Sequence, residues 1–579
     1  MALVAIDFGT SGTTYAYAFF DSKEDIILGK WNIPEIKNST EIILSKNNYE
    51  IKKFGNECKK FFLDQSSLKE EFYHFKDIKM KLYENQTEIK ATNGKISLKL
   101  EFVISKILIY IKEEAIKAIK AVRPLIEERE IEWKVTVPAI WNNKSKEIML
   151  NAAKKANIFT EDNELCFLAL EPEAAACDYT NEGTSDRNAI KPGKVYIICD
   201  IGGGTIDIST HKRIISNGEM HIEEVYPPSG GNFGSTYINK NFFEKVIKKI
   251  FGDIAIKKLE EKINNPKKNE IIYEDYIELL NDIEEFKKDI SVNVENDAKR
   301  INCSLFEELI DNNISNLIEN YNDNCPLGWE IRKYNGFRIH FPYQIMIDIT
   351  KEILVNNVVR HLHKIMKDVS NVESIIYAGS VSSNDYILLM IKNALPDNIM
   401  HYRSAYPSTA VVKGAVIFGF NPFSIKTRIS KYTIGISVRE KWNNLIHGFR
   451  KDLKFFDEKD KCYYCGKIFS PIILQNQKTK VDESLKKSYE LMGPKSEVIF
   501  YKTNFNKVTF VDEKYRDSNN NKKRKCIQLC KTFFNVGDLY DEDEKEVIVE
   551  LILGGTFVYG KVIYKNYELP VQFDFSREE

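Results

Sequence analysis

The chain has 579 residues, 43% of them hydrophobic and 12% aromatic, which is long enough for roughly two to four folded domains. Its 83 basic and 84 acidic residues leave a formal net charge of −1, so the whole chain has no overall attraction to nucleic acid or to an anionic membrane. No apolar run approaches the roughly 18–20 residues of a membrane span, and the chain reaches Asp7 without a basic segment, so we expect neither a membrane helix nor a signal peptide. Ten cysteines in a chain of this length fit a reducing cytoplasm better than a disulfide framework, and we expect a cytoplasmic protein.

The chain begins with an apolar strand and a glycine-rich turn, Ile6-Asp7-Phe8-Gly9-Thr10-Ser11-Gly12-Thr13-Thr14. Glycine and small side chains let backbone N–H groups approach an anion. A carboxylate beside bound phosphates makes chemical sense when a divalent cation, usually Mg²⁺ with its waters, lies between them. The turn therefore predicts a site for a phosphate chain and a metal ion.

Helical and strand patterns follow this turn. Apolar spacing predicts a helix over 102–120, a strand over 134–138 and a helix over 144–156. Residues 164–180 predict a strand, a break at Glu171-Pro172 and then a helix of small residues.

A second glycine-rich turn lies about 190 residues after the first, in Ile198-Cys199-Asp200-Ile201-Gly202-Gly203-Gly204-Thr205-Ile206-Asp207. It has the same pattern as the first turn: an apolar strand that runs into an aspartate, followed by small residues. Two copies predict two related lobes that close on one phosphate chain. With Asp7, Asp200 and Asp207 facing each other, the pair of turns predicts a clamp for a magnesium nucleotide.

The second half of the chain changes character near Pro422. Before it, residues 236–320 are mostly helical and highly charged, and residues 322–340 have the composition of an inserted loop. The predicted elements that follow are helix over 343–367, strand–turn–helix over 373–395 and a last helix over 408–419. After it, short β-type segments dominate, so we interpret 430–579 as a separate β domain. We interpret the basic run 516–525 as a solvated loop rather than a nucleic-acid site, because no aromatic residues are interleaved.

Six segments of the chain, in this order, resemble the actin-type ATPase core of the 70-kDa heat-shock proteins. They are Asp7–Thr14, Val137-Pro138-Ala139, Leu170–Ala176, Asp200–Asp207, Ile376–Ser380 and Ala410–Ala415. Three further segments resemble the divergent branch called heat shock 70 kDa protein 12: Tyr15–Phe19, Phe75–Lys81 and Gly234–Tyr237. The resemblance to that branch extends, more loosely, into the closing β region.

The resemblance implies an α/β fold of the actin-like ATPase (ribonuclease H-like) type. Its two lobes would cover 1–195 and 196–422, with a helical subdomain at about 236–320, and a small all-β domain would cover 430–579. It also implies a protein that binds ATP and ADP with Mg²⁺ and hydrolyses ATP slowly. The nucleotide state would control lobe closure and the contact of the β domain with client or partner proteins.

Site residues follow from the resemblance, position by position. The implied catalytic residues are Lys76, Glu171, Asp200 and Asp207, with Asp7 and Asp200 holding Mg²⁺ mainly through its water shell. The implied phosphate-binding residues are Gly9, Thr10, Ser11, Gly202, Gly203, Gly204 and Thr205. Lys76 would neutralise charge on the transferred phosphoryl group, and Lys79 stays open as the alternative because the matching segment is short.

The adenosine end would be formed by one helix face and by glycines that let backbone approach the nucleotide. The residues concerned are Glu284, Lys287, Lys288 and Ser291, at positions i, i+3, i+4 and i+7, together with Gly230, Gly231, Gly379 and Ser380. Two positions depart from the family: Lys288 replaces an arginine, and Ser380 replaces a second glycine. The acidic interdomain linker, the helical lid and the acidic tail motif of the family are not matched either, which leaves ATP-gated peptide capture in doubt.

Other functions stay open from the residues alone. The missing linker and lid favour a nucleotide-dependent sensor or interaction scaffold with little turnover. A small-molecule kinase of the same fold is a further alternative, and an actin-like filament former is less favoured. Four thiolates, from Cys462, Cys465, Cys526 and Cys530, could bind zinc, although unliganded cysteines in strands or turns are the favoured interpretation.

Overall fold

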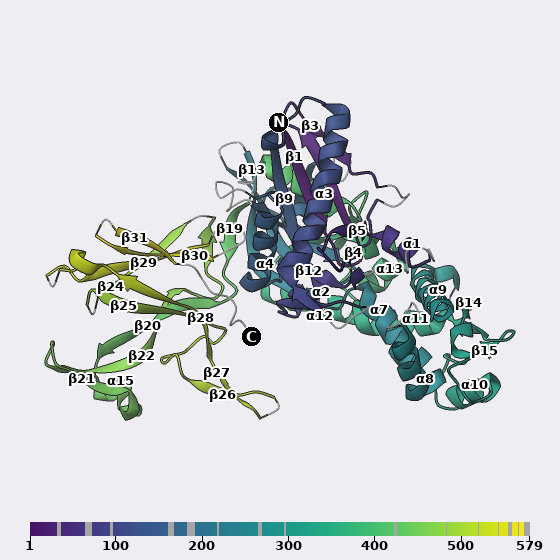
Figure 1. Cartoon of the computed structure of the whole chain (residues 1–579). Coiled ribbons are helices and arrows are strands. Elements are labelled where there is room, and N and C mark those ends of the chain that lie inside the picture. Colours follow the sequence, from purple (N-terminus) through teal and green to yellow (C-terminus); the bar gives the residue numbers. More distant parts are fainter. Residues whose placement is uncertain are drawn as a thin grey trace. The chain divides into compact units, whose positions relative to one another are not determined.

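A computed structural model describes most of the chain. The described residues are 1–31, 36–63, 72–92, 96–159, 167–181, 191–216, 219–263, 269–294, 297–421, 425–481, 483–491, 493–518, 520–541, 543–553, 558–565 and 567–571. The chain forms two compact units (Figure 1). Unit 1 contains 1–141, 147–209 and 229–422, and unit 2 contains 142–146, 210–228 and 423–579.

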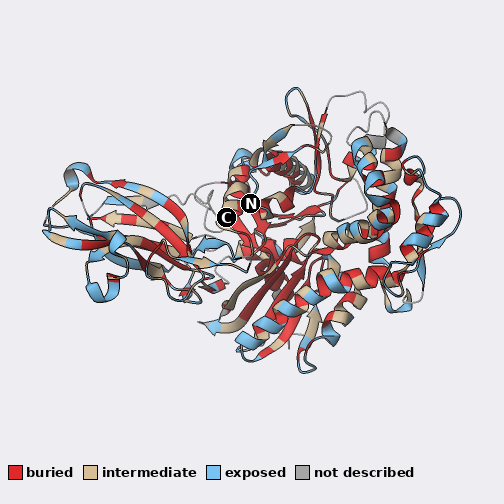
Figure 2. Cartoon of the chain, turned by 90° about the horizontal axis from the view of Figure 1, so that it is seen from below, coloured by how far each residue is buried: buried red, intermediate tan, exposed pale blue. Residues whose placement is uncertain are grey.

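The first sheet of unit 1 carries the first glycine turn. Its strand order is β10 (Leu168–Leu170), β9 (Ile131–Val137), β1 (Ala2–Phe8), β2 (Thr13–Phe19) and β3 (Ser22–Leu28). Strand β1 is parallel to β9, and β9 is parallel to β10, so the carboxyl ends of these three strands meet at one edge of the sheet. Every residue of β1 and β2 is buried, and Figure 2 shows how continuous this burial is along the strands of unit 1. The edge therefore presents Asp7, near the end of β1, and Glu171, directly after β10, to the same region.

The second sheet carries the second glycine turn in the same way. Within unit 1 its strand order is β18 (Met400–Arg403), β17 (Val372–Ala378), β11 (Val195–Ile201) and the first part of β12 (Ile206–Ser216). Strands β17 and β11 are parallel, with Asp200 opposite Ala378. Asp200 and Gly379 therefore lie at neighbouring strand ends. The chain enters unit 2 along β12 and returns along β13 (Glu219–Gly231).

Helices cover much of the remaining chain before the second unit. In chain order they are α1 (Asn56–Leu63), α2 (Ile78–Tyr83), α3 (Leu100–Val122), α4 (Asn143–Lys155), α6 (Glu171–Asn181), α7 (Ser235–Phe242), α8 (Lys248–Ile263), α9 (Glu270–Lys288), α10 (Ile314–Asn322), α11 (Tyr343–Thr350), α12 (Asn356–Asp368), α13 (Asp385–Asn393) and α14 (Ala410–Phe420). The predicted helices at 102–120, 144–156 and 408–419 match α3, α4 and α14 to within two residues. None of the described helices is long and apolar enough to cross a membrane.

Helices α6 and α14 approach each other unusually closely. A side-chain carbon placed on Gly414 of α14 would lie only 1.6 Å from the backbone oxygen of Ala174 in α6. Glycine at 414 is required here because any side chain would collide with the backbone of the facing helix.

Small sheets lie in segments for which the sequence predicted no strands. Strands β5 (Ile51–Phe54), β4 (Ile42–Ser45) and β6 (Phe72–Phe75) form one, and β7 (Glu88–Lys90) pairs with β8 (Ser97–Lys99). Strands β14 (Ala298–Asn302), β16 (Arg338–Pro342) and β15 (Arg332–Lys333) form another. The prediction of an irregular loop over 322–340 was therefore wrong in part, because two short strands there pair with a strand from within the helical segment.

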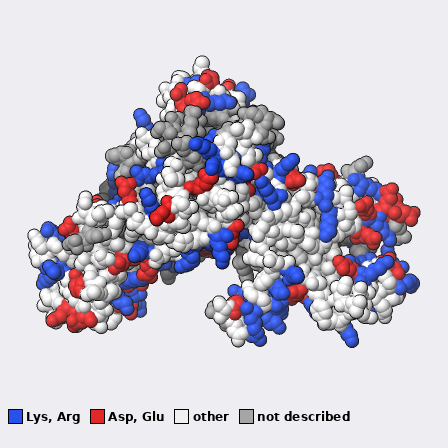
Figure 3. Space-filling view, turned by 180° about the vertical axis from the view of Figure 1, so that it is seen from behind, with Lys and Arg blue, Asp and Glu red and all other residues white. Residues whose placement is uncertain are grey.

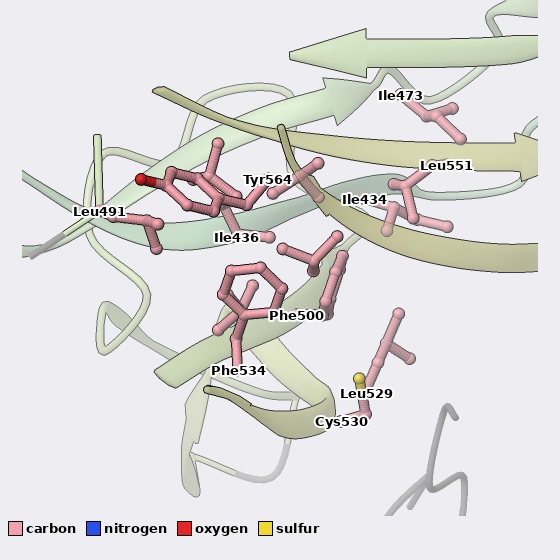
Figure 4. Close-up of a cluster of buried hydrophobic side chains, with 14 of the residues drawn as sticks. Ile434, Ile436, Ile473, Leu491, Phe500, Leu529, Cys530, Phe534, Leu551 and Tyr564 are labelled. Carbon is pink, nitrogen blue, oxygen red and sulfur yellow. The ribbon is translucent and has the colours of Figure 1, made fainter. Parts of the chain in front are cut away.

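Unit 2 contains two antiparallel sheets with a common hydrophobic core (Figure 4). One sheet has the order β21 (Lys454–Asp457), β22 (Cys462–Ile473), β20 (Thr433–Lys441), β25 (Lys495–Thr503) and β28 (Cys526–Asn535). The other has the order β24 (Ser484–Glu490), β29 (Glu546–Leu553), β30 (Val558–Tyr564) and β31 (Tyr567–Val571). Phe500 and Phe534 from the first sheet pack with Leu551 and Tyr564 from the second. The sheets therefore form a sandwich with a single dry interior.

The remaining strands of unit 2 lie outside this sandwich. Strand β13 pairs with β19 (Ile425–Ile429), and β19 pairs with β23 (Lys478–Lys480). A hairpin is formed by β26 (Lys514–Arg516) and β27 (Lys522–Arg524). The loop predicted between strands over 516–525 begins and ends inside that range, because Arg516 and Lys522–Arg524 belong to the paired strands.

Glu224 of β13 is a buried carboxyl group in unit 2. The backbone N–H of Ile429 donates a hydrogen bond to its Oε2 at 2.8 Å. Burial raises the pKa of Glu224 to about 8, although this hydrogen bond and the charge of Lys146 act in the opposite direction. The folded protein therefore prefers Glu224 protonated.

We expect unit 2 to lose stability as the pH rises. Because the folded pKa of Glu224 lies above the unfolded value, its contribution is complete below about pH 4.5 and is lost as the pH rises through about 8, by up to about 5 kcal/mol. Glu224→Gln should remove this loss, so urea unfolding at pH 5 and pH 8 should show a smaller difference than in the wild type. Glu223→Gln is the matched control, because the neighbouring Glu223 is paired with Lys478 at 2.8 Å. An unchanged pH dependence in Glu224→Gln would contradict this interpretation.

Candidate functional site

A cleft in unit 1 contains both glycine turns. Its lining residues are Asp7, Gly9, Thr10, Ser11, Gly12, Lys37, Lys79, Glu171, Asp200, Gly202, Gly203, Gly204, Thr205, Gly379, Ser380, Pro407, Ser408 and Val411. The structure thus brings together the two segments that the sequence placed on either side of a phosphate chain.

The two turns are in direct contact. A side-chain carbon on Gly204 would lie 2.3 Å from Thr10 Oγ1, and one on Gly203 would lie 2.6 Å from Ser11 Oγ. The hydroxyl groups of the first turn therefore lie against the backbone of the second. Backbone N–H groups and small hydroxyl side chains at such a place form a cradle for an anion.

Lys79 forms a buried ion pair with Glu171. Lys79 Nζ lies 2.5 Å from Glu171 Oε1, and the two side chains are 4% and 6% exposed. Burial by itself lowers the pKa of Lys79, but Glu171, Asp7 and Asp207 together outweigh it and raise the pKa. The lysine therefore stays charged inside a group of carboxylates.

The lysine that the structure places in the cleft is Lys79 and not Lys76. Lys76 is exposed and lies outside the cleft lining. Asp77 adopts a left-handed conformation, with φ of 56°, and α2 begins at the next residue. In that helix Ile78, Lys79 and Met80 are buried. The signal available in the sequence was the apolar pair on either side of Lys79.

Asp7 pairs with a lysine that the sequence gave no reason to select. Lys37 Nζ lies 2.6 Å from Asp7 Oδ2, and the Thr136 hydroxyl donates to Asp7 Oδ1 at 3.2 Å. Two backbone hydrogen bonds between Thr13 and Asn38 hold the segment of Lys37 beside the first turn. No local motif marks Lys37, because only this pairing brings it to the site.

The other carboxylates are buried close to one another. Burial, followed by the charges of Asp207 and Asp7, raises the pKa of Asp200 to about 7. Burial also raises the pKa of Glu171, against the effect of Lys79. Burial raises the pKa of Asp207 as well, although the N–H of Ile140 donates to its Oδ1 at 3.2 Å. The site thus contains more carboxyl groups than its own lysines can pair with, and their raised pKa values report this crowding.

This arrangement fits a hydrated divalent cation. The Oδ2 atom of Asp207 is buried and makes no hydrogen bond of normal geometry with the described residues. In the described part of the chain, no three His, Cys, Asp or Glu side chains are close enough to bind one metal ion together. Buried carboxylates beside backbone and hydroxyl donors suit a Mg²⁺ ion that keeps several of its waters.

The residues predicted for the adenosine end are only partly at the cleft. Gly379 and Ser380 line it, whereas Gly230, Gly231, Glu284, Lys287, Lys288 and Ser291 do not. Helix α9 ends at Lys288, so the prediction that Ser291 lies on the same helix face was wrong. Glu284 Oε2 instead accepts hydrogen bonds from Lys287 at 2.6 Å and from Asn239 at 2.7 Å.

The end of α9 is nevertheless linked to the segment after Gly379. Asn384, which caps α13, donates from Nδ2 to the backbone oxygen of Ile290 at 3.0 Å. The backbone N–H of Gly379 donates to the oxygen of Pro407 at 3.0 Å. These contacts join α9, the Gly379 turn and the Pro407 segment next to the phosphate cradle. Pro407, Ser408 and Val411 are lining residues that the sequence interpretation missed, since no phosphate-binding pattern includes them.

The four cysteines considered for zinc lie in separate places. Cys465 packs with Ile468 and Phe510, Cys526 with Phe469 and Val511, and Cys530 within the sandwich core. Strand β22, which carries Cys462 and Cys465, is separated by β20 and β25 from β28, which carries the other two. All four cysteines lie in strands, where Cys465, Cys526 and Cys530 are buried and Cys462 is half-buried.

The fold and the cleft fit one class of protein. A mixed α/β structure with two strand–Asp–glycine turns facing each other fits an actin-like ATPase fold. No family model matches the chain. Individual proteins that resemble it over most of its length do support this class.

The chain is 26% identical to heat shock 70 kDa protein 12A of Mus musculus over 588 positions, which cover 89% of this chain and 83% of that protein. It is 23% identical to heat shock 70 kDa protein 12B of Homo sapiens over 563 positions, covering 84% and 78%. It is also 28% identical to the chaperone protein HscA homolog of Rickettsia typhi over 235 positions, covering 40% and 35%. The predicted relationship to a divergent branch of the 70-kDa heat-shock proteins is confirmed by these matches.

Proposed function

We propose that the cleft of unit 1 binds ATP and ADP with Mg²⁺ and hydrolyses ATP slowly. The observation that carries this proposal is the contact between the two glycine turns beside a buried group of four carboxylates and Lys79. The similarity to heat-shock proteins 12A and 12B supports nucleotide binding.

Each residue has a role that suits its position. The turns formed by Gly9–Gly12 and Gly202–Thr205 would hold the phosphates through N–H and hydroxyl donors. Asp7 and Asp200 would hold Mg²⁺ through its waters, and when bound the ion neutralises charge on the phosphates. Lys79 would stabilise the charge that develops on the transferred phosphoryl group. Glu171, held in place by Lys79, would orient the attacking water, and Asp207 would hold a water near it.

The wider cycle is also a proposal. Two lobes, 1–195 and 196–422, would change their closure with the state of the nucleotide. Unit 2 would then contact a client or partner protein in the cytoplasm. HscA is named a chaperone protein, and the similarity to it supports an interaction of this kind.

The first test compares the wild type with Asp200→Asn. We expect the variant to lose Mg²⁺-dependent nucleotide binding by calorimetry, and to hydrolyse labelled ATP at least about a hundredfold more slowly in a single turnover, because one preorganised charge is removed. Asp385→Asn is the control, since Asp385 is exposed and paired with Arg403 away from the cleft. Tight binding without turnover in the wild type would favour the alternative of a nucleotide-sensing scaffold. Absence of binding would refute the proposal.

A further inference from the structure

Unit 2 exposes three large apolar side chains on one short helical turn. They belong to α15 (Asn444–His447) and the residues after it: Leu445 is 95% exposed, Ile446 51% and Phe449 74%. We call these three residues the apolar tip. Single exposed apolar residues are ordinary, but a cluster of this kind marks a site of interaction.

The apolar tip is held in place by its neighbours. Asn443 caps the turn by accepting a hydrogen bond from Leu445 N at 2.8 Å. His447 is buried beside Trp442, with ring centres 5.6 Å apart. The ring of Phe449 meets the edge of Phe510 at 5.7 Å. The turn therefore presents its apolar side chains from a packed base.

The hairpin of β26 and β27 carries a face of positive charge. Lys514 lies opposite Arg524, and Arg516 lies opposite Lys522. Residues that face each other or lie two apart share one side of a hairpin, so these four cations form one side, which we call the cationic face. All four are exposed, and Figure 3 shows Lys and Arg gathered on this projecting hairpin.

The like charges of the cationic face destabilise the pairing of β26 with β27. Like charges that lie directly opposite each other destabilise a two-stranded ladder. Among the described residues, no acidic side chain forms an ion pair with Lys514, Lys522 or Arg524. The other side of the hairpin is different, because Tyr515 packs on Phe505 with ring centres 4.9 Å apart and Lys523 pairs with Asp517 at 3.4 Å. The cationic face therefore lacks charge compensation within the described chain.

One loop anchors both features. Arg450, next to the apolar tip, forms two hydrogen bonds with Asp512 at 2.8 and 2.9 Å. The adjacent Glu513 pairs with Lys525 at 2.8 Å, at the base of the hairpin. Figure 1 shows α15 and the hairpin on the same side of the unit. Asp512 is thereby paired, so it does not cancel the charge of the cationic face.

We propose that this side of unit 2 binds the surface of an anionic lipid bilayer. The apolar tip would enter the boundary of the acyl chains, and the cationic face would bind lipid phosphate and carboxylate groups. A nucleic acid would satisfy the cations but would leave Leu445 and Phe449 in water. An apolar protein segment would cover the tip but would leave Lys514, Lys522 and Arg524 without anionic partners. This inference is independent of nucleotide binding and goes beyond the proposed function.

The first test uses the charge of two neighbouring lysines. Full-length protein is sedimented with vesicles of phosphatidylcholine alone, or of equal parts phosphatidylcholine and phosphatidylserine, without nucleotide. We expect binding only to the mixed vesicles, and about a twenty-five-fold loss with Lys522→Glu, since each unit of charge near an anionic surface contributes roughly fivefold and this substitution changes the charge by two. Lys523→Glu makes the same charge change on the other side of the hairpin and should bind like the wild type. Equal losses in both variants, or no binding to either vesicle, would overturn the proposal.

A second pair of variants tests the apolar tip. Leu445→Ser should weaken binding to the mixed vesicles about tenfold, because the apolar area that enters the bilayer is lost. Leu125→Ser is the control, since Leu125 is 94% exposed but lies in unit 1. A duplex DNA added as competitor should not displace the protein from vesicles. Stronger binding to DNA than to vesicles, unchanged by Leu445→Ser, would assign the cationic face to nucleic acid instead and refute a bilayer site.

Discussion

We expect Gly379→Ala to abolish nucleotide binding and Gly193→Ala to leave it unchanged. Both glycines have nearly the same positive φ, +83° and +84°. A side-chain carbon on Gly379 would lie 2.3 Å from Asp200 Oδ1 and 2.4 Å from the backbone oxygen of Ile201. No described atom lies within 4 Å of the same carbon on Gly193. The pair of variants therefore separates backbone strain from collision with the site.

The expected magnitudes follow from this difference. A positive φ costs an alanine about 1–3 kcal/mol at either position, and the collision at Gly379 adds about 1–3 kcal/mol. Urea unfolding should thus show a larger loss of stability for Gly379→Ala, and calorimetry should show loss of nucleotide binding only there. Intact binding in Gly379→Ala would show that Asp200 can move without consequence, and would contradict its assignment to the site.

Lys79→Met is the second substitution with a large expected effect. It should slow single-turnover hydrolysis by roughly a hundred- to a thousandfold while nucleotide affinity changes little, because in the proposed function the charge of Lys79 would act on the transferred phosphoryl group. It also breaks a buried ion pair, which costs about 3–5 kcal/mol when one partner is left without the other. Calorimetry, single-turnover kinetics and urea unfolding measure the three effects separately.

Two controls make this prediction specific. Lys76→Met should behave like the wild type, because Lys76 is exposed and outside the cleft lining. The double variant Lys79→Met with Glu171→Gln should recover part of the stability, since the carboxylate that was paired with Lys79 is removed together with it, but none of the turnover. If Lys76→Met reduced turnover as much as Lys79→Met, the assignment of the lysine would have to return to Lys76.

The sequence predicted those site residues that lie at the ends of strands. Asp7 and Asp200 each follow an apolar strand and precede glycines, so their place at a sheet edge could be derived from the local pattern. Lys37 could not be found in this way, because a backbone pairing between Thr13 and Asn38 brings it to the site. The choice between Lys76 and Lys79 depended on where α2 begins, which is set by the left-handed Asp77.

Short strands were predicted less well than helices. The hairpin of β26 and β27 escaped prediction because its cross-strand pairs, such as Lys514 with Arg524, are of like charge and oppose strand formation. Strands β15 and β16 have only two and five residues, too few for a clear alternation. Helix α9 ends at Lys288, three residues before the predicted face would have reached Ser291. Local pattern thus indicates which segments are helical better than where each one stops.

The close approach of Gly414 to Ala174 has a mechanical consequence. Helix α14 is the last helix before the chain leaves unit 1, and α6 begins with Glu171. Since their backbones touch at this point, a small rotation or slide of α14 would be passed to α6 without being absorbed by flexible side chains. Tension on the chain after Phe420 would thereby reach the carboxylate beside Lys79. In the proposed function, the contact between the two helices would therefore link the end of unit 1 to Glu171, the residue proposed to orient the attacking water.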